Sequence, residues 1–443
     1  MVTTIHSEGS IAQRNYAIGS LFHGFENVIY VILMLYFTGA VSGILFTDLN
    51  DLERDFPMAR MMWYPVYVGI ALLALRCFPQ FLRISVFNTL LVICVMVCGI
   101  SMLWSIDQSI TLRRAVALVM TTVFGLVIAA RYDWNGMVQR LALVFGILAI
   151  FTLLHGIIDP DRAKHTELHA GAWRGPWVQK NYLGSQMTRG FVVMMCAFAM
   201  RPDRAWCWVP LGLLCFALVI LSTSKTALLA CIAAIGLFLI LRMFRRFPVL
   251  RIPVAYFFIA GLAAFATMAI FIPEVLLELI GKDRTLTGRT DIWDALLRSI
   301  KEKPWLGFGY GVYWLDQLGP SYYVRLQLEW GIPTAHNGWI ETWLSVGLLG
   351  VLLFAMLFIW SSILAFQRIS RGGVETYWVI LVLAVFFIFS LSESAVLQQN
   401  DFSWVIFVAT IAKLFAFEKP YWRNKPRENY FTQIIPTLSL IHI

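Results

Sequence analysis

Charged residues are scarce in this sequence. They account for 14% of its 443 residues, whereas hydrophobic residues account for 59% and the mean hydropathy is +0.72. A soluble domain carries about 25% charged residues, so this chain has too little polar surface to face water. The shortage predicts a chain whose solvent is lipid. The net charge of +9 is then no sign of a nucleic-acid partner, because the position of each charge matters more than the sum.

Cysteine pairs at metal-binding or redox spacing are also missing. All seven cysteines fall inside apolar runs, none forms a CxxC pair, and no histidine or acid accompanies them at ligand spacing: Cys77, Cys94, Cys98, Cys196, Cys207, Cys215 and Cys231. We therefore expect buried, inert thiols rather than disulfides or a metal site. The N-terminus lacks the short basic and apolar segments of a cleavable signal, so the first apolar run is expected to remain.

Long hydrophobic runs, by contrast, are abundant. A helix that spans about 30 Å of hydrocarbon needs roughly 20 mostly apolar residues. Such runs occur at residues 26–47, 62–78, 84–104, 113–131, 137–158, 182–200, 204–222, 225–243, 252–273, 339–366, 376–392 and 402–417. Because these runs are continuous rather than alternating in polarity, they exclude a strand barrel. They predict an all-α, polytopic membrane bundle of about 12 transmembrane helices.

Lysine and arginine in the short loops predict the orientation of the bundle. Every second short loop is basic, which the positive-inside rule requires of cytoplasmic loops. The cations concerned are Arg76, Arg83, Arg131, Arg140, Arg201, Arg204, Arg242, Arg245, Arg246, Arg251, Arg368, Arg371, Lys419, Arg423, Lys425 and Arg427. Both termini are therefore expected inside. The predicted regions are a cytoplasmic N-terminus (1–25), N-terminal helices (26–272) with an outer loop (159–181), a large outer loop (273–337), C-terminal helices (338–417) and a cytoplasmic tail (418–443).

The two outer loops are basic although membrane insertion gives no reason for positive charge there. They contain Arg162, Lys164, Arg174, Lys180, Lys282, Arg284, Arg289, Arg298, Lys301, Lys303 and Arg325. Two interpretations stay open, an anionic ligand and ordinary solvated loop charges. Within the larger loop, apolar residues at helical spacing predict an amphipathic helix before Pro304, which lies on the membrane surface or caps a cavity. These residues are Ile292, Trp293, Leu296, Leu297 and Ile300.

Four segments on the predicted outer face share a pattern with a known family. They are GAWRGPWVQKNYLG (171–184), STSKTALL (222–229), LTGRTDIWDALL (286–297) with PWLGFGYG (304–311), and AHNGWIETWLSVGLLG (335–350). Their order, spacing and position resemble the O-antigen ligase and polysaccharide polymerase superfamily. The first segment, the lysine in STSKT and SESAVLQQNDFSW (392–404) are most similar to the exopolysaccharide polymerase branch. Ligases usually carry arginine where this chain has Lys225.

The resemblance implies a glycosyltransferase, probably inverting in the family's manner only as an expectation, on the periplasmic face of the bacterial inner membrane. The donor would be an undecaprenyl-pyrophosphate-linked oligosaccharide. The acceptor would be another glycan for a polymerase or lipid A core for a ligase, and a flippase and a chain-length regulator would be partners. No cofactor is expected, and no metal, since the chain has no acid cluster suited to Mg²⁺.

The same resemblance assigns cations to the leaving group. A pyrophosphate gains negative charge as the glycosidic bond breaks, and fixed cations can stabilise that charge without a metal. Arg289 matches the family's loop arginine, and a guanidinium can donate two parallel hydrogen bonds to phosphate. Lys225 matches the second cation. Arg174, Lys180 and Asn181 are further candidates for substrate binding, with structural roles as the alternative.

A histidine is the candidate base for the acceptor hydroxyl. His336 lies in the AHN motif between the basic loop and a membrane helix, and imidazole titrates nearest neutral pH. Asn337 is expected to orient His336 or cap the following helix. Glu341, four residues further along, is an intramembrane acid and hence either a substrate-binding group or a structural hydrogen-bond partner.

A transporter of lipid-linked oligosaccharides is the alternative from another class. Twelve helices with cytoplasmic termini suit it as well. Transporters, however, place their charged residues and broken helices near the midplane, whereas the distinctive polar residues here are predicted on the outer face. Residues 1–220 also do not echo residues 221–443.

Overall fold

The computed structural model describes residues 24–46, 56–166, 169–250, 253, 289–315, 319–328 and 331–416. Within these ranges the chain is helical apart from one isolated bridge between Lys164 and Trp173. The predicted all-α class is therefore confirmed, and the apolar helices make this a multi-pass membrane protein. The predicted helix 252–273 falls outside the described ranges, as do most of the predicted N-terminus and the tail.

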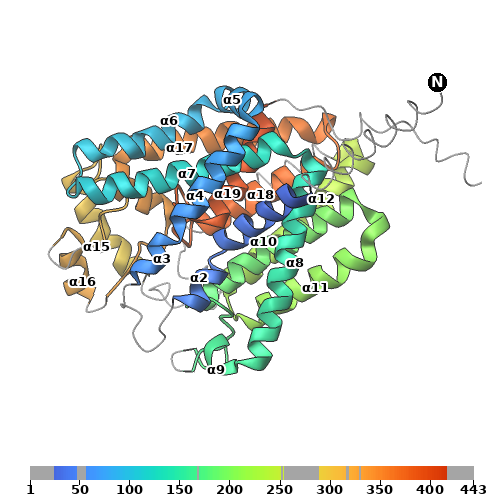
Figure 1. Cartoon of the computed structure of the whole chain (residues 1–443), viewed down its shortest axis with the longest axis horizontal. Coiled ribbons are helices and arrows are strands. Elements are labelled where there is room, and N and C mark those ends of the chain that lie inside the picture. The colour runs from blue at the N-terminus through green and yellow to red at the C-terminus, as the bar shows by residue number, and fades with distance from the viewer. Residues whose placement is uncertain are drawn as a thin grey trace, which may run out of the picture.

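The helices follow one another with short connections. The first, Gly24–Phe37, leads into α2. The remaining elements are α2 (Ala40–Leu45), α3 (Pro57–Met61), α4 (Trp63–Arg76), α5 (Phe78–Phe87), α6 (Thr89–Ile100), α7 (Gln108–Arg131), α8 (Trp134–Ile158), α9 (Pro160–Ala163), α10 (Lys180–Met200), α11 (Ala205–Leu221), α12 (Lys225–Arg246), α15 (Arg289–Glu302), α16 (Ser321–Leu328), α17 (Gly338–Arg371), α18 (Glu375–Ser390) and α19 (Phe402–Phe415). In Figure 1, α6, α7 and α17 run side by side toward α15 and α16.

The prediction of about 12 spanning helices is not confirmed. Among the described residues, six helices are long and apolar enough to cross a membrane, or up to seven if the bent pair α5 and α6 counts as one span. Some predicted spans are real helices that are too short. The 14 residues of α19 extend about 21 Å at 1.5 Å per residue. Every residue of α19 is buried, so this helix fills the protein interior instead of facing lipid.

The predicted run 84–104 is broken for a local reason. The chain bends by 88° between Phe78–Phe87 and Thr89–Leu103. Asn88 lies at the bend and is 2% exposed. Its side-chain amide donates hydrogen bonds to the carbonyl oxygens of Ile84, at 2.9 Å, and Ala412, at 3.3 Å. A hydropathy pattern does not reveal such a bend, because the residues on both sides of it are apolar.

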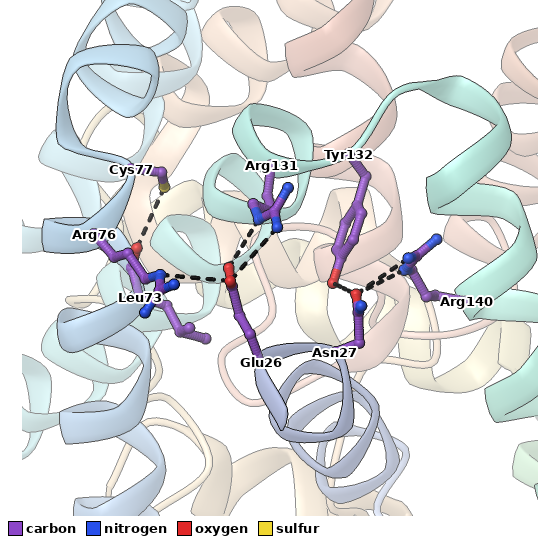
Figure 2. A network of polar contacts seen from close by, with 8 residues as sticks. All are labelled: Glu26, Asn27, Leu73, Arg76, Cys77, Arg131, Tyr132 and Arg140. Carbon is purple, nitrogen blue, oxygen red and sulfur yellow. Dashed lines mark hydrogen bonds and ion pairs between the residues drawn. The ribbon is translucent and has the colours of Figure 1, made fainter. Parts of the chain in front are cut away.

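The predicted cytoplasmic cations gather at one end of the bundle, here called the inner end, which contains Glu26, Arg76 and Arg131. Figure 2 shows Glu26 accepting from Arg131 Nε at 2.8 Å and pairing with Arg76 Nε at 3.4 Å. Beside them, Asn27 Oδ1 accepts from Tyr132 Oη and from Arg140. The helix Gly24–Phe37 is thus joined to α4, α7 and α8 by charged and polar contacts.

The Glu26 contacts predict a stability effect. Glu26→Gln leaves two arginines facing a neutral amide, and we expect the free energy of unfolding to fall by about 1–3 kcal/mol. The thermal midpoint in detergent should drop accordingly. The control is Asp203→Asn, which removes an ion pair with Arg201 on the surface, where Asp203 is 57% exposed. Exposed pairs contribute about 1 kcal/mol or less, so equal losses in the two variants would contradict a structural role for Glu26.

The opposite end, here called the outer end, is built around a break in α17. Inside this helix Val346 and Gly347 have non-helical backbone angles, with φ of 70° at Gly347. The segment from Pro304 to Gly309 fills the break. Phe308 N donates to Leu344 O at 2.8 Å and Gly309 N to Ser345 O at 3.0 Å. In return, Leu348 N donates to Pro304 O at 2.8 Å.

These bonds give the backbone groups freed by the break new partners, which a membrane interior demands. They also fix the outer segment firmly to α17. The predicted amphipathic helix is confirmed as α15, whose Ile292, Leu296 and Ile300 are buried. Trp293 Nε1 of α15 donates to Ala335 O at 3.0 Å, so α15 lies against the AHN segment.

Candidate functional site

Strained backbone marks the segments that the sequence singled out. Among the described residues, the non-glycine residues with positive φ are Thr223 (52°), His336 (48°), Leu397 (51°) and Asn400 (57°). Such a conformation costs about 1–3 kcal/mol and is often found at functional sites. Thr223 lies in STSKT, His336 in AHN, and the other two in SESAVLQQNDFSW.

His336 lies immediately before α17 and faces an acid. Its side chain is 15% exposed, and its Nδ1 is 3.8 Å from Oε2 of Glu393. That nitrogen is buried and has no hydrogen-bond partner among the described residues. Asn337 caps α17, as one of the two predictions for it held, since its Oδ1 accepts from the backbone N–H groups of Trp339, at 2.9 Å, and Ile340, at 3.2 Å. The cap fixes the direction in which the chain leaves His336.

Glu341 connects the histidine turn to its surroundings. Its Oε2 accepts from Ala335 N at 3.0 Å and from Ser394 Oγ at 3.5 Å, and its Oε1 accepts from Trp314 Nε1 at 2.8 Å. Both carboxylate oxygens are therefore engaged by the protein. This geometry supports the structural interpretation of Glu341 over direct substrate binding.

A buried polar cluster lies behind Glu393. Asp401 caps α19 by accepting from Trp404 N at 3.0 Å, and it accepts from Tyr182 Oη at 3.2 Å. Burial raises the pKa of Asp401, while the positive charge of Arg189 opposes that rise. Arg189 is within electrostatic range of both Asp401 and Glu393, and it also donates to Ser185 Oγ at 3.2 Å.

Sequence reasoning missed Arg189, Glu393 and Asp401 as site residues. A signal for Arg189 was present, since it lies inside the predicted span 182–200 and an arginine within a membrane helix is a functional candidate by default. Glu393 and Asp401 lie in SESAVLQQNDFSW, a segment recognised for its resemblance but not searched for acids. Nothing in the sequence indicated that Glu393 would face His336.

Two lysines lie together at another part of the outer end. Lys180, at the start of α10, donates to Thr223 Oγ1 at 3.2 Å. Burial lowers the pKa of Lys180, and the positive charge of Lys225 lowers it further. Lys225 itself is exposed at the first position of α12, and Asn181 is half-buried. The Lys180–Lys225 pair therefore presents positive charge to the solvent, with no ion pair to either lysine among the described residues.

The other predicted cations behave differently. Arg174 donates to the backbone carbonyls of Arg162, at 2.9 Å, and Asp161, at 3.3 Å, so its guanidinium holds the outer loop together. Arg289 begins α15, but its side chain lies outside the described part of the structure. No described contact joins Lys225 to His336. The predicted convergence of Arg289, Lys225 and His336 thus stays a prediction.

A polar cavity of about 300 Å³ adjoins the histidine turn. It lies against the break in α17 and is lined by residues from several segments that are far apart in sequence, among them Arg114, Tyr310, Arg325, Glu341 and Gln399. Tyr310 Oη donates to Leu397 O at 2.6 Å, which holds the SESAVLQQNDFSW segment in place. The cavity is at the small end of the usual range for ligand sites.

The described residues include no group of three histidine, cysteine, aspartate or glutamate side chains that could hold a metal ion. The sequence does contain an Asp-X-Asp at 159–161. There Asp159 caps α9 by accepting from Arg162 N at 3.3 Å. This acid pair is accordingly accounted for by local structure.

Comparison with known proteins defines the class of this chain. The family model described as O-antigen ligase matches residues 210–355. This range contains Lys225, Arg289 and His336. The match is therefore to the part of the chain that carries the candidate catalytic residues.

A particular relative agrees with this class. The chain is 29% identical over 271 residues to the exopolysaccharide production protein ExoQ of Rhizobium meliloti (strain 1021). The alignment covers 59% of this chain and 61% of the relative, so the chain spans less than two thirds of that protein. The two matches confirm the predicted resemblance to the O-antigen ligase and polysaccharide polymerase superfamily, on its exopolysaccharide side.

Proposed function

We propose that this protein is a membrane glycosyltransferase that polymerises undecaprenyl-pyrophosphate-linked oligosaccharides at the periplasmic face of the inner membrane. The observation that carries the proposal is His336, held at a positive φ of 48° next to Glu393 within a segment matched by the O-antigen ligase model. A strained, partly buried histidine beside an acid is an arrangement suited to taking a proton.

The proposed step assigns a role to each group. Because Nδ1 of His336 faces Glu393, Nε2 is left to accept the proton of the acceptor hydroxyl. The hydroxyl oxygen attacks the anomeric carbon of the donor sugar, and the bond from that carbon to the pyrophosphate oxygen breaks. The proton goes to His336, where Glu393 stabilises the imidazolium. The bond electrons go to the pyrophosphate, whose growing charge Arg289, Lys225 and Lys180 stabilise without a metal. Attack from the face opposite the leaving group gives inversion.

Polymerisation is favoured over ligation by the relative, whose name assigns it to exopolysaccharide production. Lysine at position 225, where ligases usually carry arginine, is consistent with that choice. A ligase would accept lipid A core instead of a second carrier-linked glycan. The two activities therefore differ in the acceptor rather than in the chemistry at His336.

The test uses purified full-length protein in nanodiscs with lipid-linked repeat units. We expect longer glycans with the wild type and none with His336→Ala or Arg289→Ala. Unchanged chain lengths in both variants would falsify the enzyme and leave a transporter, which moves such lipids without changing them. Adding lipid A core should alter the product only if the protein is a ligase.

Glu393 has a positioning role in this proposal, which predicts its own phenotype. Glu393→Gln removes the charge that faces His336 Nδ1 and should lower kcat by roughly 10- to 100-fold with little change in KM. Glu393→Asp keeps the charge and should recover part of the rate. A merely structural role for Glu393 would instead lower the thermal midpoint and the amount of folded protein in both variants alike.

A further inference from the structure

Two arginines line the polar cavity beside the histidine turn. Arg114 comes from α7 and Arg325 from α16, and both are partly buried. Neither forms an ion pair with any carboxylate in the described ranges. The structure thus places two guanidinium groups in one cavity of about 300 Å³ without a matching anion.

The hydrogen bonds of these arginines orient them but leave donors unused. Arg114 Nη1 donates to Gly311 O, and Arg325 Nη2 donates to Trp314 O at 2.7 Å. Arg325 Nε makes a longer bond to Ile332 O, at 3.4 Å. A guanidinium has five N–H donors, so most donors of both arginines have no described partner. The backbone carbonyls hold the two side chains in fixed positions without neutralising them.

Glu341 does not fill the part of the missing anion. It lines the same cavity and interacts electrostatically with Arg114, but its two oxygens are engaged by Trp314, Ala335 and Ser394. Two positive charges against one negative charge leave the cavity with a positive balance. At the inner end, by contrast, Glu26 pairs directly with the arginines beside it.

Unpaired charges removed from water cost several kcal/mol, and their persistence here indicates a ligand that supplies the opposite charge. We propose that the cavity binds an acidic group of the acceptor glycan, such as the carboxylate of a uronic acid or of an acidic substituent. This inference rests on the proposed function. The remaining lining suits a sugar, because Thr342, Ser345 and Gln398 offer hydroxyl and amide groups.

The position of the cavity fits an acceptor rather than the donor's pyrophosphate. Ser394 and Glu341 line it, and they neighbour or contact the turn that holds His336, which takes the acceptor's proton in the proposed step. The Lys180–Lys225 pair, proposed for the pyrophosphate, contributes no residue to the cavity. Specificity for acidic glycans would then be determined by Arg114 and Arg325.

The experiment compares Arg114→Gln and Arg325→Gln with Arg113→Gln, an exposed neighbour on α7 that does not line the cavity. Binding is measured in nanodiscs with a glucuronic-acid-containing disaccharide and its carboxyl-reduced, neutral form. All proteins also carry His336→Ala, so that binding is read without turnover. We expect each cavity variant to weaken binding of the acidic sugar by roughly 10- to 100-fold, with unchanged binding of the neutral form.

Arg113→Gln should bind both sugars as the parent does, and unchanged binding of the neutral form reports that the cavity variants are folded. Equal binding of acidic and neutral forms by the parent, or equal weakening of both by the variants, would overturn the proposal. Competition by inorganic pyrophosphate that disappears in the cavity variants, with no preference for the acidic sugar, would also overturn it and assign the arginines to the donor. Because this assay needs no turnover, its outcome is separate from that of the polymerisation test.

Discussion

Replacement of His336 by alanine is expected to lower the rate of glycan extension by about 100-fold or more, because general base catalysis typically contributes 10²–10⁴-fold. The side chain that remains cannot take the acceptor's proton, and Glu393 then faces an empty position. Donor binding should persist, since the cations proposed for the pyrophosphate are untouched. The measurement is the initial rate of chain extension with purified protein, together with the KM for the lipid-linked donor.

A matched control is His165→Ala, which changes a histidine of the other outer loop. His165 is held by backbone bonds, with its N–H donating to Ala172 O at 2.9 Å, and has no proposed role. It should extend glycans at the normal rate. A His336→Ala protein that is as active as His165→Ala would remove the base from the mechanism, whatever its effect on folding.

Substitution of Gly347 by alanine is expected to destabilise the protein by about 3 kcal/mol or more. The backbone angles at Gly347, φ 70° and ψ −171°, are nearly restricted to glycine and cost other residues about 1–3 kcal/mol. A Cβ atom there would also overlap the carbonyl of Trp305. Relief of that overlap would move the Pro304–Gly309 segment away from α17 and break their hydrogen bonds. We expect a lower thermal midpoint in detergent and loss of activity together.

The control for this prediction is Gly236→Ala in α12. An added Cβ at Gly236 meets no atom within 4 Å, and alanine in a helix is more favourable than glycine by about 1 kcal/mol. This variant should be as stable as the parent or more so. A Gly347→Ala protein with an unchanged thermal midpoint would mean that the break in α17 tolerates side chains and is not held by the outer segment.

Hydropathy and periodicity predicted the helical class and α15, because both follow from the local order of apolar and polar residues. The same signals could not predict the bend at Asn88 or the break at Gly347. In both places an apolar run continues through the interruption, and the partners that stabilise it are distant in sequence. Asn88 bonds to Ala412, and Gly347 lies against Trp305.

The candidate site shows the same division. The AHN motif indicated His336, and the capping by Asn337 follows from residue type alone. The approach of Glu393 to His336 and the shared cavity of Arg114 and Arg325 depend on how α7, α16 and α17 pack. Arg114 lies at the outer start of α7, where a sequence offers no means to tell a lipid-facing arginine from one that faces a cavity.

The break in α17 has a consequence for how the protein is made. A broken helix that entered lipid alone would carry unpaired amide and carbonyl groups, each costing several kcal/mol. Leu344, Ser345 and Leu348 find their partners between Pro304 and Gly309, which the ribosome synthesises earlier. Translocation of that earlier segment and completion of the helix are therefore coupled, so that a defect in the loop would trap the chain during biogenesis, before any substrate is met.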